Sequence, residues 1–233
     1  MGWDAWIRGG VEVLPSLYAA DFTRLGAQID GLLAAGARSF HFDVGDGHFI
    51  PPVTIGPIVL RSIAPAIHAA GGIIDCHLMV DNPEHHFAEI AASGGDTVSF
   101  HHEVCADPAA AAAHARRLGL VPGLAFSPGT AVVDAAHAAA AVDFVLCMSI
   151  YPGYSGQLFL AAALDRIREL RRLLQARVPI EADGGIGAAN VAAVCQAGAA
   201  LLVAGYAIFG EPDPAGAYRA LATAVGAGAA TRP

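Results

Sequence analysis

A histidine and an aspartate, His41 and Asp43, stand two positions apart near the end of a short run at 38–44 in which polar and apolar residues alternate. On a β-strand, residues two apart project to the same face, so these side chains lie together while their apolar neighbours project to the other side. A histidine beside a carboxylate at a strand end suits a divalent metal or proton transfer. A buried ion pair or a solvated polar loop explains the same two residues, so the rest of the chain has to decide.

The elements that must position this pair alternate between strands and helices along the chain. Short apolar or β-branched runs predict strands, and apolar residues at helical spacing predict the helices between them. The expected strands are 11–17, 38–44, 73–80, 97–101, 121–126, 144–149, 178–182 and 200–204. The expected helices are 22–33 with Asp21 as its cap, 58–69, one from 82 onward, 107–118, 130–140, 160–176, 188–197 and 213–224.

Strands and helices in this alternation indicate right-handed crossovers and a parallel sheet. Eight pairs close naturally into a barrel, and 233 residues suit one such domain. A doubly wound open sheet usually carries a glycine-rich dinucleotide turn after its first strand, and residues 15–18 do not form one. The prediction is an α/β protein with a single (β/α)8 TIM barrel over 1–233, in which 1–10 is a short N-terminal extension and 226–233 a flexible C-terminal tail.

Composition excludes several classes of function. Hydrophobic residues make up 55% of the chain and charged residues 15%, which predicts a compact fold rather than a disordered segment. A formal charge of −8 without a basic run argues against nucleic-acid and membrane-surface partners. The four cysteines are scattered and no long apolar run is present, so a reduced, cytoplasmic protein is expected.

In such a barrel the active site lies at the C-terminal ends of the strands, where further ligand-type residues recur. His77 stands near the end of the third expected strand, and Asp183 directly follows the seventh. With His41 and Asp43 they offer two imidazoles and two carboxylates, which suit one Zn, Mn, Fe or Co ion. Asp43 and Asp183 also approach from roughly opposite sides of the barrel mouth, so one can remove a proton while the other supplies one.

Glycines and methionines gather at the same end of the predicted barrel. The pair Gly184-Gly185 and the later Gly205 let backbone N–H groups approach an anion, although a tight turn explains such glycines equally well. Residues 152–157 predict either a mobile lid or an ordinary surface loop. Met79 and Met148 are expected to be apolar walls that limit water, or core filler. No catalytic role is assigned to the other histidines near strand ends, His48, His101 and His102.

Several sequence strings fall in a familiar order and spacing. They are LPSLYAADF at 14–22, HFDVGDGHF at 41–49, HLM at 77–79, MS at 148–149 with PGYSGQ at 152–157, EADGGI at 181–186, and VAG at 203–205 with AIF at 207–209. Together they resemble the ribulose-phosphate 3-epimerase family over about residues 11–209. The resemblance implies a metal-dependent barrel, often dimeric or hexameric, that interconverts D-ribulose 5-phosphate and D-xylulose 5-phosphate and holds one divalent ion per subunit.

The resemblance also implies roles for individual residues. His41, Asp43, His77 and Asp183 would bind the metal, and Asp43 and Asp183 would exchange the C3 proton through a cis-enediolate. The substrate would be contacted by Ser16, His77, Met79 and Met148, by the lid residues Gly153, Tyr154, Ser155 and Gly156, and by the phosphate-cradle residues Gly184, Gly185, Gly205 and Tyr206.

Two departures from the family pattern bear on the substrate. Gly45 stands where the family usually has methionine, which predicts open space, and Tyr206 stands where a serine usually helps to bind phosphate. They keep open the same chemistry on a hexulose 6-phosphate, of the allulose 6-phosphate type, or on an unphosphorylated ketose. A non-catalytic barrel that binds sugar phosphates is a further alternative, although binding alone does not need both aspartates. A related decarboxylase is disfavoured because no strand-end motif contains a lysine.

Overall fold

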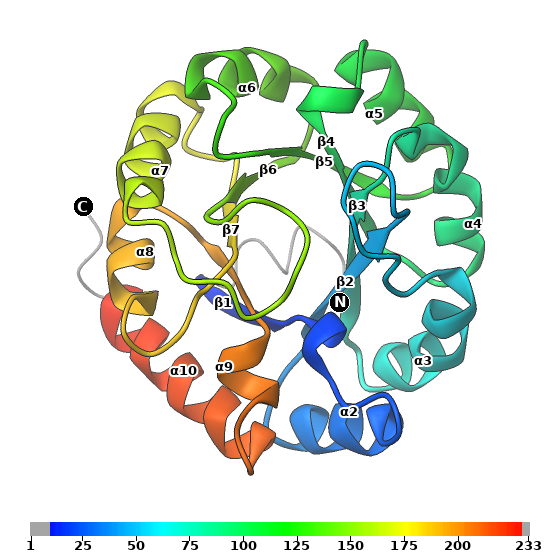
Figure 1. Ribbon diagram of the computed structural model, residues 1–233, viewed down its shortest axis with the longest axis vertical. Coiled ribbons are helices and arrows are strands. Elements are labelled where there is room, and N and C mark those ends of the chain that lie inside the picture. Colours follow the sequence, from blue (N-terminus) through cyan, green and yellow to red (C-terminus); the bar gives the residue numbers. More distant parts are fainter. Residues whose placement is uncertain (1–9, 230–233) are drawn as a thin grey trace.

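The eight strands form a ring with the helices outside it (Figure 1). The computed structural model of the chain describes residues 10–229. Its strands are β1 Glu12–Pro15, β2 Ser39–Gly45, β3 Ile73–Met79, β4 Thr97–His101, β5 Val121–Phe126, β6 Phe144–Met148, β7 Ile180–Asp183 and β8 Leu201–Ala204. They pair in parallel in the order β1-β8-β7-β6-β5-β4-β3-β2, and a parallel bridge between Ser16 and His41 brings β1 beside β2. The fold is a (β/α)8 TIM barrel, as predicted.

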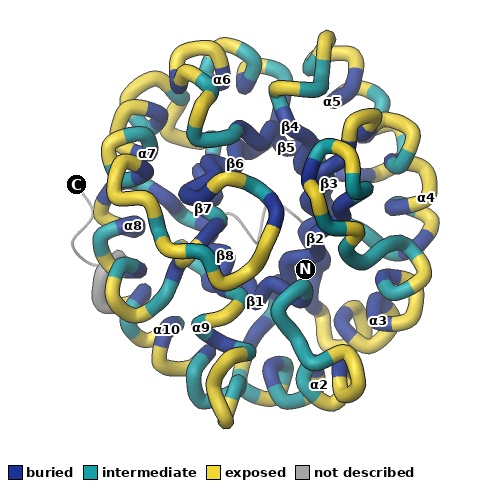
Figure 2. The backbone as a smooth tube through the Cα atoms, viewed as in Figure 1, coloured by how far each residue is buried: buried dark blue, intermediate teal, exposed yellow. Residues whose placement is uncertain are grey.

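Helices follow the strands and cover the outside of the barrel. The α-helices are α2 Leu25–Ala34, α3 Pro57–Ala69, α4 Phe87–Ala92, α5 Pro108–Arg117, α6 Val132–Ala138, α7 Ala162–Leu173, α8 Val191–Ala197, α9 Tyr206–Phe209 and α10 Pro214–Ala229. Short 3-10 helices are Leu17–Ala19, Pro83–His85, His102–Val104 and Ala139–Ala141. The helices bury one face against the strands and expose the other, as Figure 2 shows.

The helix bounds differ from the prediction where local hydrogen bonds compete with helix formation. Asp21 was expected to cap a helix that begins at Phe22, but its Oδ1 accepts from the Thr23 N–H at 3.0 Å, and α2 begins only at Leu25. Such a side-chain turn offers the backbone an alternative to the helix. The single helix expected from residue 82 onward is divided between the 3-10 helix Pro83–His85 and α4.

The inside of the barrel is layered, because alternate residues of each strand point inward. Leu14, Ile73, Leu201 and Val203 form a small apolar cluster. Nearer the C-terminal ends of the strands the side chains become polar, and the β2–β3 register pairs His41 with Asp75 and Asp43 with His77. The β7–β8 register pairs Glu181 with Leu201 and Asp183 with Val203, so apolar side chains of β8 lie beside the acids of β7.

The ends of the chain fall largely outside this description. The predicted extension 1–10 lies outside the described residues except for Gly10, and so do residues 230–233 of the predicted tail. The first four residues of that tail belong to α10. Within residues 10–229, no helix has both the length and the apolar character needed to cross a membrane.

Candidate metal centre and active site

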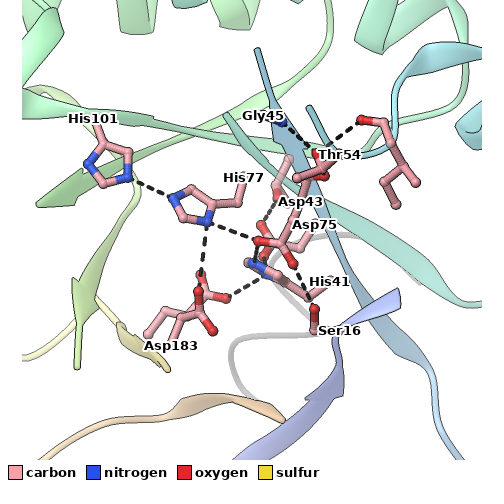
Figure 3. Close-up of polar contacts among 12 residues, drawn as sticks. Ser16, His41, Asp43, Gly45, Thr54, Asp75, His77, His101 and Asp183 are labelled. Carbon is pink, nitrogen blue, oxygen red and sulfur yellow. Dashed lines mark hydrogen bonds and ion pairs between the residues drawn. The ribbon is translucent and has the colours of Figure 1, made fainter. Parts of the chain in front are cut away.

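The structure brings the side chains of His41, Asp43, His77 and Asp183 together at the mouth of the barrel (Figure 3). The first three come from the neighbouring strands β2 and β3, and Asp183 comes from the end of β7. One ligand atom of each residue lies within 4.8 Å of those of the other three. Asp43 Oδ1 is 3.1 Å from His41 Nε2 and 3.2 Å from His77 Nδ1. Asp183 Oδ2 lies 3.8 Å from His77 Nδ1.

The pKa values of the two carboxyl groups in this cluster are shifted in opposite directions. Burial, reinforced by the charge of Asp43, raises the pKa of Asp183 to about 7. Burial also acts to raise the pKa of Asp43, but the charge of His41 and hydrogen bonds with His41 and His77 outweigh it and hold that pKa below its usual range. Near neutral pH, Asp43 is therefore ionised, whereas Asp183 exchanges a proton readily.

The second ring nitrogen of His41 meets acids deeper in the barrel. Its Nδ1–H donates to Asp75 Oδ2 at 2.6 Å, and Asp75 in turn accepts from the Thr97 hydroxyl. Glu181 Oε1 approaches the same nitrogen at 3.3 Å. Burial and the charge of Asp75 hold the pKa of Glu181 well above its usual range, whereas hydrogen bonds with His41 and Thr97 outweigh burial and lower the pKa of Asp75. The Asp75 carboxylate thus leaves His41 Nε2 directed at the cluster.

The second ring nitrogen of His77 meets another histidine. His77 Nε2 lies 2.9 Å from His101 Nε2, as Figure 3 shows, and His101 Nδ1 lies 3.0 Å from Glu103 Oε2. Burial lowers the pKa of His101 to about 4. Burial acts to raise the pKa of Glu103, but hydrogen bonds from His101 and from Thr130 outweigh it and lower that pKa to about 2.

These donors fit a divalent metal ion. Two imidazole nitrogens and two carboxylates form a sulfur-free set that Zn, Mn, Fe and Co accept. The nitrogens that face the cluster differ, Nε2 in His41 and Nδ1 in His77, and the opposite nitrogen of each ring has a protein partner, as is usual for metal-binding histidines. Metal binding by the four residues stays a prediction.

A cavity of about 310 Å³ opens above the cluster. Asp43 and Asp183 reach it, whereas His77, which was also expected to contact substrate, does not line it. The other predicted substrate residues all line it: Ser16, Met79, Met148, Gly153, Tyr154, Ser155, Gly156, Gly184, Gly185, Gly205 and Tyr206. Ser16 Oγ donates to Asp43 Oδ2 at 2.6 Å, which holds the carboxylate at the cavity floor.

The glycines after β7 allow the lid loop to pack closely. Gly184 and Gly185 have φ angles of +116° and +65°, which disfavour other residues. A Cβ on Gly184 would lie 2.3 Å from Ile150 Cγ1, and one on Gly185 would lie 2.5 Å from the Phe159 nitrogen. Packing and turn geometry therefore already require these glycines, and their contact with phosphate stays a prediction.

The comparison with protein families agrees with this geometry. The model of the ribulose-phosphate 3 epimerase family matches residues 12–209, which include every strand and all four residues of the cluster. This chain belongs to that family.

Curated relatives match the chain over most of its length. Ribulose-phosphate 3-epimerase 1 of Cupriavidus necator is 37% identical over 218 residues, which cover 91% of this chain and 89% of the relative. The ribulose-phosphate 3-epimerase of Bacillus subtilis is 35% identical over 207 residues, covering 87% of this chain and 94% of that protein. That of Escherichia coli K12 is 37% identical over 204 residues, covering 86% and 90%.

Solved structures at lower identity show the fold alone. A 3-hexulose-6-phosphate synthase is 22% identical and superposes with a TM-score of 0.67, over 92% of this chain and 99% of that one. The orotidine 5'-phosphate decarboxylase of Pyrococcus horikoshii is 17% identical with the same TM-score, over 91% and 98%.

One departure from the epimerase family pattern, Gly45, does not leave the open space that was predicted. A Cβ at this position would lie 2.5 Å from Ile50 Cδ1 and 3.0 Å from Thr54 Cγ2, so these side chains occupy the space. Thr54 Oγ1 also accepts from the Gly45 N–H at 2.6 Å and donates to the Asp43 carbonyl at 2.8 Å. The loop after β2 thus folds back over Gly45, and the expected opening is wrong.

The other departure, Tyr206, stands at the start of α9 beside Gly205. Its ring leans against Gly210, where a Cβ would lie 2.9 Å from Tyr206 Cε2, and 68% of the residue is exposed. The ring therefore forms part of the rim of the cavity without closing it.

Sequence reasoning missed the residues behind the two histidines. No role was predicted for Asp75, Glu181, Glu103 or His101. Strand alternation was the available signal, because Asp75 precedes His77 by two positions and Glu181 precedes Asp183 by two. His101 ends β4 as His77 nears the end of β3, which was a weaker signal of the same kind.

Proposed function

We propose that this chain is a metal-dependent ketose-phosphate 3-epimerase that interconverts D-ribulose 5-phosphate and D-xylulose 5-phosphate. One observation carries the proposal: Asp43 and Asp183 reach the floor of one cavity from β2 and β7, and their pKa values are shifted in opposite directions. A pair of acids with separated proton affinities suits a reaction that needs a base on one side of a carbon and an acid on the other. Family membership supports the same reaction.

The metal would be held by His41 Nε2, His77 Nδ1 and the carboxylates of Asp43 and Asp183. When bound, a divalent ion acidifies the C3–H bond by stabilising negative charge on the neighbouring oxygens. The ion is Zn, Mn, Fe or Co in this proposal, and the donor set accepts each of them.

The two aspartates exchange the proton on C3. One carboxylate takes the proton as the C3–H bond breaks, and the electron pair of that bond moves into the C2–C3 bond while the C2 carbonyl gains a negative charge. The other carboxylic acid then donates a proton to C3 from the opposite face, and the carbonyl forms again. Asp43, ionised and held by Ser16, and Asp183, with a pKa of about 7, suit these roles and exchange them in the reverse direction.

Other residues bind the substrate and exclude water. The side chains of Met79 and Met148 are buried and line the cavity, so they give the reacting carbon an apolar wall. The phosphate would lie near Gly184, Gly185 and Gly205, under the lid formed by 153–156. The exposed Tyr206 leaves this position open, which supports a phosphorylated substrate.

Removing either aspartate tests the mechanism. With metal-loaded protein and ribulose 5-phosphate in D2O, NMR is expected to show inversion and deuterium uptake at C3. Asp43→Asn and Asp183→Asn should each slow inversion at least about 100-fold, which general acid–base catalysis commonly contributes. Asp165→Asn, an exposed carboxylate on α7, is the charge-matched control and should leave the rate unchanged. Inversion at the wild-type rate in either active-site variant would contradict the two-aspartate mechanism.

The substrate is tested by a panel. Ribulose 5-phosphate, free ribulose and allulose 6-phosphate are compared by kcat/KM on one metal-loaded preparation. We expect the pentulose phosphate to be preferred, and a preference for either other ketose would favour the second proposal, the same chemistry on a hexulose 6-phosphate or unphosphorylated ketose.

The assembly and location complete the proposal. By analogy with the family, we propose a cytoplasmic homo-oligomer, a dimer or hexamer, with one metal ion per subunit and no nucleic-acid or membrane partner. Light scattering and elemental analysis of the purified protein test the assembly and the metal content, and a monomer in solution would contradict the oligomer.

A further inference from the structure

We propose that Glu103 and His101 are positioning residues that fix the tautomer of His77, so that its Nδ1 lone pair faces the metal cluster. The inference rests on the metal site of the proposed function but concerns metal binding, not the choice of sugar. It starts from a chain of three side chains that joins the cluster to the edge of the barrel. Figure 3 shows the link from His77 to His101, and Glu103 lies beyond it.

Glu103, the outermost of these three side chains, fixes the donor–acceptor direction of the hydrogen bonds that link them. Glu103 Oε1 accepts from the Ser127 N–H at 2.7 Å and also from the Thr130 hydroxyl. Its other oxygen, Oε2, faces His101 Nδ1 at 3.0 Å. An ionised carboxylate only accepts hydrogen bonds, so the proton between these two residues belongs to His101 Nδ1.

The hydrogen-bond direction at His101 Nδ1 also determines which histidine donates in the contact between His77 and His101. The Nε2 atoms of His77 and His101 are 2.9 Å apart, so one proton lies between them. With His101 neutral and Nδ1 protonated, its Nε2 is an acceptor and His77 Nε2–H is the donor. In the metal-bound protein, His77 then has a lone pair on Nδ1, the atom 3.2 Å from Asp43 and 3.8 Å from Asp183.

The opposite arrangement is incompatible with a metal ligand. If His101 donated through Nε2, it would be a cation, and neutral His77 would carry its proton on Nδ1. That proton would point at Asp43 and Asp183 and occupy the position that a metal needs. Metal binding and the hydrogen-bond direction that Glu103 sets through His101 therefore favour the same tautomer of His77.

Packing prevents the rings from escaping this arrangement. His77 and His101 are both 0% exposed, and their rings stack with centroids 5.1 Å apart and planes inclined by 28°. The Phe49 ring lies on His101 with a centroid distance of 4.6 Å. His101 is thus held between Phe49 and His77, and the orientation of its two nitrogens is set by Glu103.

The variant Glu103→Gln reverses the polarity with almost no change of shape. The Ser127 N–H can only donate, so it holds the amide oxygen on its side and leaves the amide NH2 facing His101 Nδ1. His101 Nδ1 then becomes an acceptor, its Nε2 a donor, and the His77 proton moves to Nδ1. We expect the affinity for Zn²⁺, measured by competition with a chromogenic chelator, to fall about 10–100-fold.

Two further variants separate polarity from packing. Thr130→Val removes one hydrogen bond to Glu103 without reversing the chain, and zinc affinity should stay close to that of the wild type. His101→Gln offers its amide oxygen to His77 and its amide N–H to Glu103, which keeps the polarity, so its loss should be smaller than that of Glu103→Gln. Circular dichroism confirms that each variant is folded before its affinity is compared.

The wild-type protein provides a readout that needs no variant. Two-bond ¹H–¹⁵N correlation spectra of the zinc-loaded protein distinguish a protonated, an unprotonated and a metal-bound ring nitrogen. We expect metal-bound Nδ1 and protonated Nε2 in His77, with protonated Nδ1 and unprotonated Nε2 in His101. Zinc bound through Nε2 of His77, or a Glu103→Gln variant with wild-type affinity, would overturn the inference.

These measurements do not depend on turnover. A protein that shows these tautomers and loses zinc on Glu103→Gln, yet leaves ribulose 5-phosphate unchanged, would contradict the proposed function and uphold the inference. A protein that epimerises the sugar while Glu103→Gln binds zinc normally would do the reverse.

Discussion

The two histidines at the centre of this barrel have the same chemical role in the proposal but different surroundings. Behind His41 lies a carboxylate, Asp75, in direct contact and fully buried. Behind His77 lies a second imidazole, that of His101. The carboxylate of Glu103 contacts His101 instead of His77, and 26% of the Glu103 side chain is exposed. The first histidine is held from inside the barrel, and the second is held from its edge.

The difference follows from the cost of buried charge. Asp43, Asp75, Glu181 and Asp183 already place four carboxyl groups inside the barrel, and the raised pKa values of Glu181 and Asp183 reflect that crowding. A further carboxylate directly behind His77 would add to it, since burying an ion costs several kcal/mol. The neutral imidazole of His101 lets Glu103 set the hydrogen-bond direction at His77 while the negative charge of Glu103 stays near water.

The largest effect is expected when the carboxylate behind His41 is removed. Asp75→Ala removes the direct acceptor of a buried ring nitrogen, so zinc affinity should fall by about 100-fold, the upper end for such partners. Because the variant removes the short hydrogen bond of a buried ring nitrogen to its carboxylate, the free energy of unfolding should also fall by about 3 kcal/mol. Chelator competition and chemical denaturation measure the two effects. Thr97→Val, which removes only the hydroxyl donor to Asp75, is the control, and a loss in Asp75→Ala no larger than in the control would refute the direct role of Asp75.

The pH dependence of zinc binding sharpens the comparison, because neither carboxylate behind a histidine titrates near neutral pH. The pKa of Glu103 is lowered to about 2, and that of Asp75 is held below its usual range. Asp183, with a pKa raised to about 7, holds a proton below that pH, and a metal must displace it. Zinc affinity should therefore fall more steeply below pH 7 than above it, by about one additional factor of ten per pH unit.

Calorimetry in several buffers measures the protons released in this experiment. The count should rise by one between pH 8 and pH 6 in the wild type, and Asp183→Asn should abolish the rise. A constant count in the wild type would contradict the protonation of Asp183.

The smallest effect is expected at the second acid behind His41. The pKa of Glu181 is held well above its usual range by burial and by Asp75, so Glu181 keeps its proton more readily than an ordinary glutamate. Glu181→Gln replaces one neutral group with another of the same shape and should change the free energy of unfolding by less than about 1 kcal/mol. Denaturation of this variant beside Asp75→Ala tests which acid is charged, and similar losses in both would show that Glu181 is ionised.

Much of the fold was readable from the sequence because its signals are local. Apolar runs and helical spacing placed eight strands and the helices between them, and parallel closure followed from the regular alternation. The predicted helix bounds were wrong at Asp21, whose side chain forms a competing turn, and after Pro83–His85, where a 3-10 helix precedes α4. The strand-end rule also brought His41, Asp43, His77 and Asp183 to one place.

The environment of those residues was less accessible, because it depends on register and on loop return. That Asp43 faces His77 and that His101 faces its far nitrogen follow from how three strands align, which no single run reveals. At Gly45 the missing side chain is compensated by Ile50, five positions later, because the loop after β2 folds back. Composition at one position does not determine the space around it.

The distribution of the four ligand residues along the chain has a consequence for folding. His41, Asp43 and His77 belong to the first third of the sequence, whereas Asp183 arrives only with β7. An ion bound to all four would connect β2 and β3, which come early in the sequence, with β7, which comes late. Because such an ion binds the closed ring and not the open chain, it would shift the equilibrium towards closure by mass action. Metal supply would then affect the stability of the folded barrel as well as its chemistry.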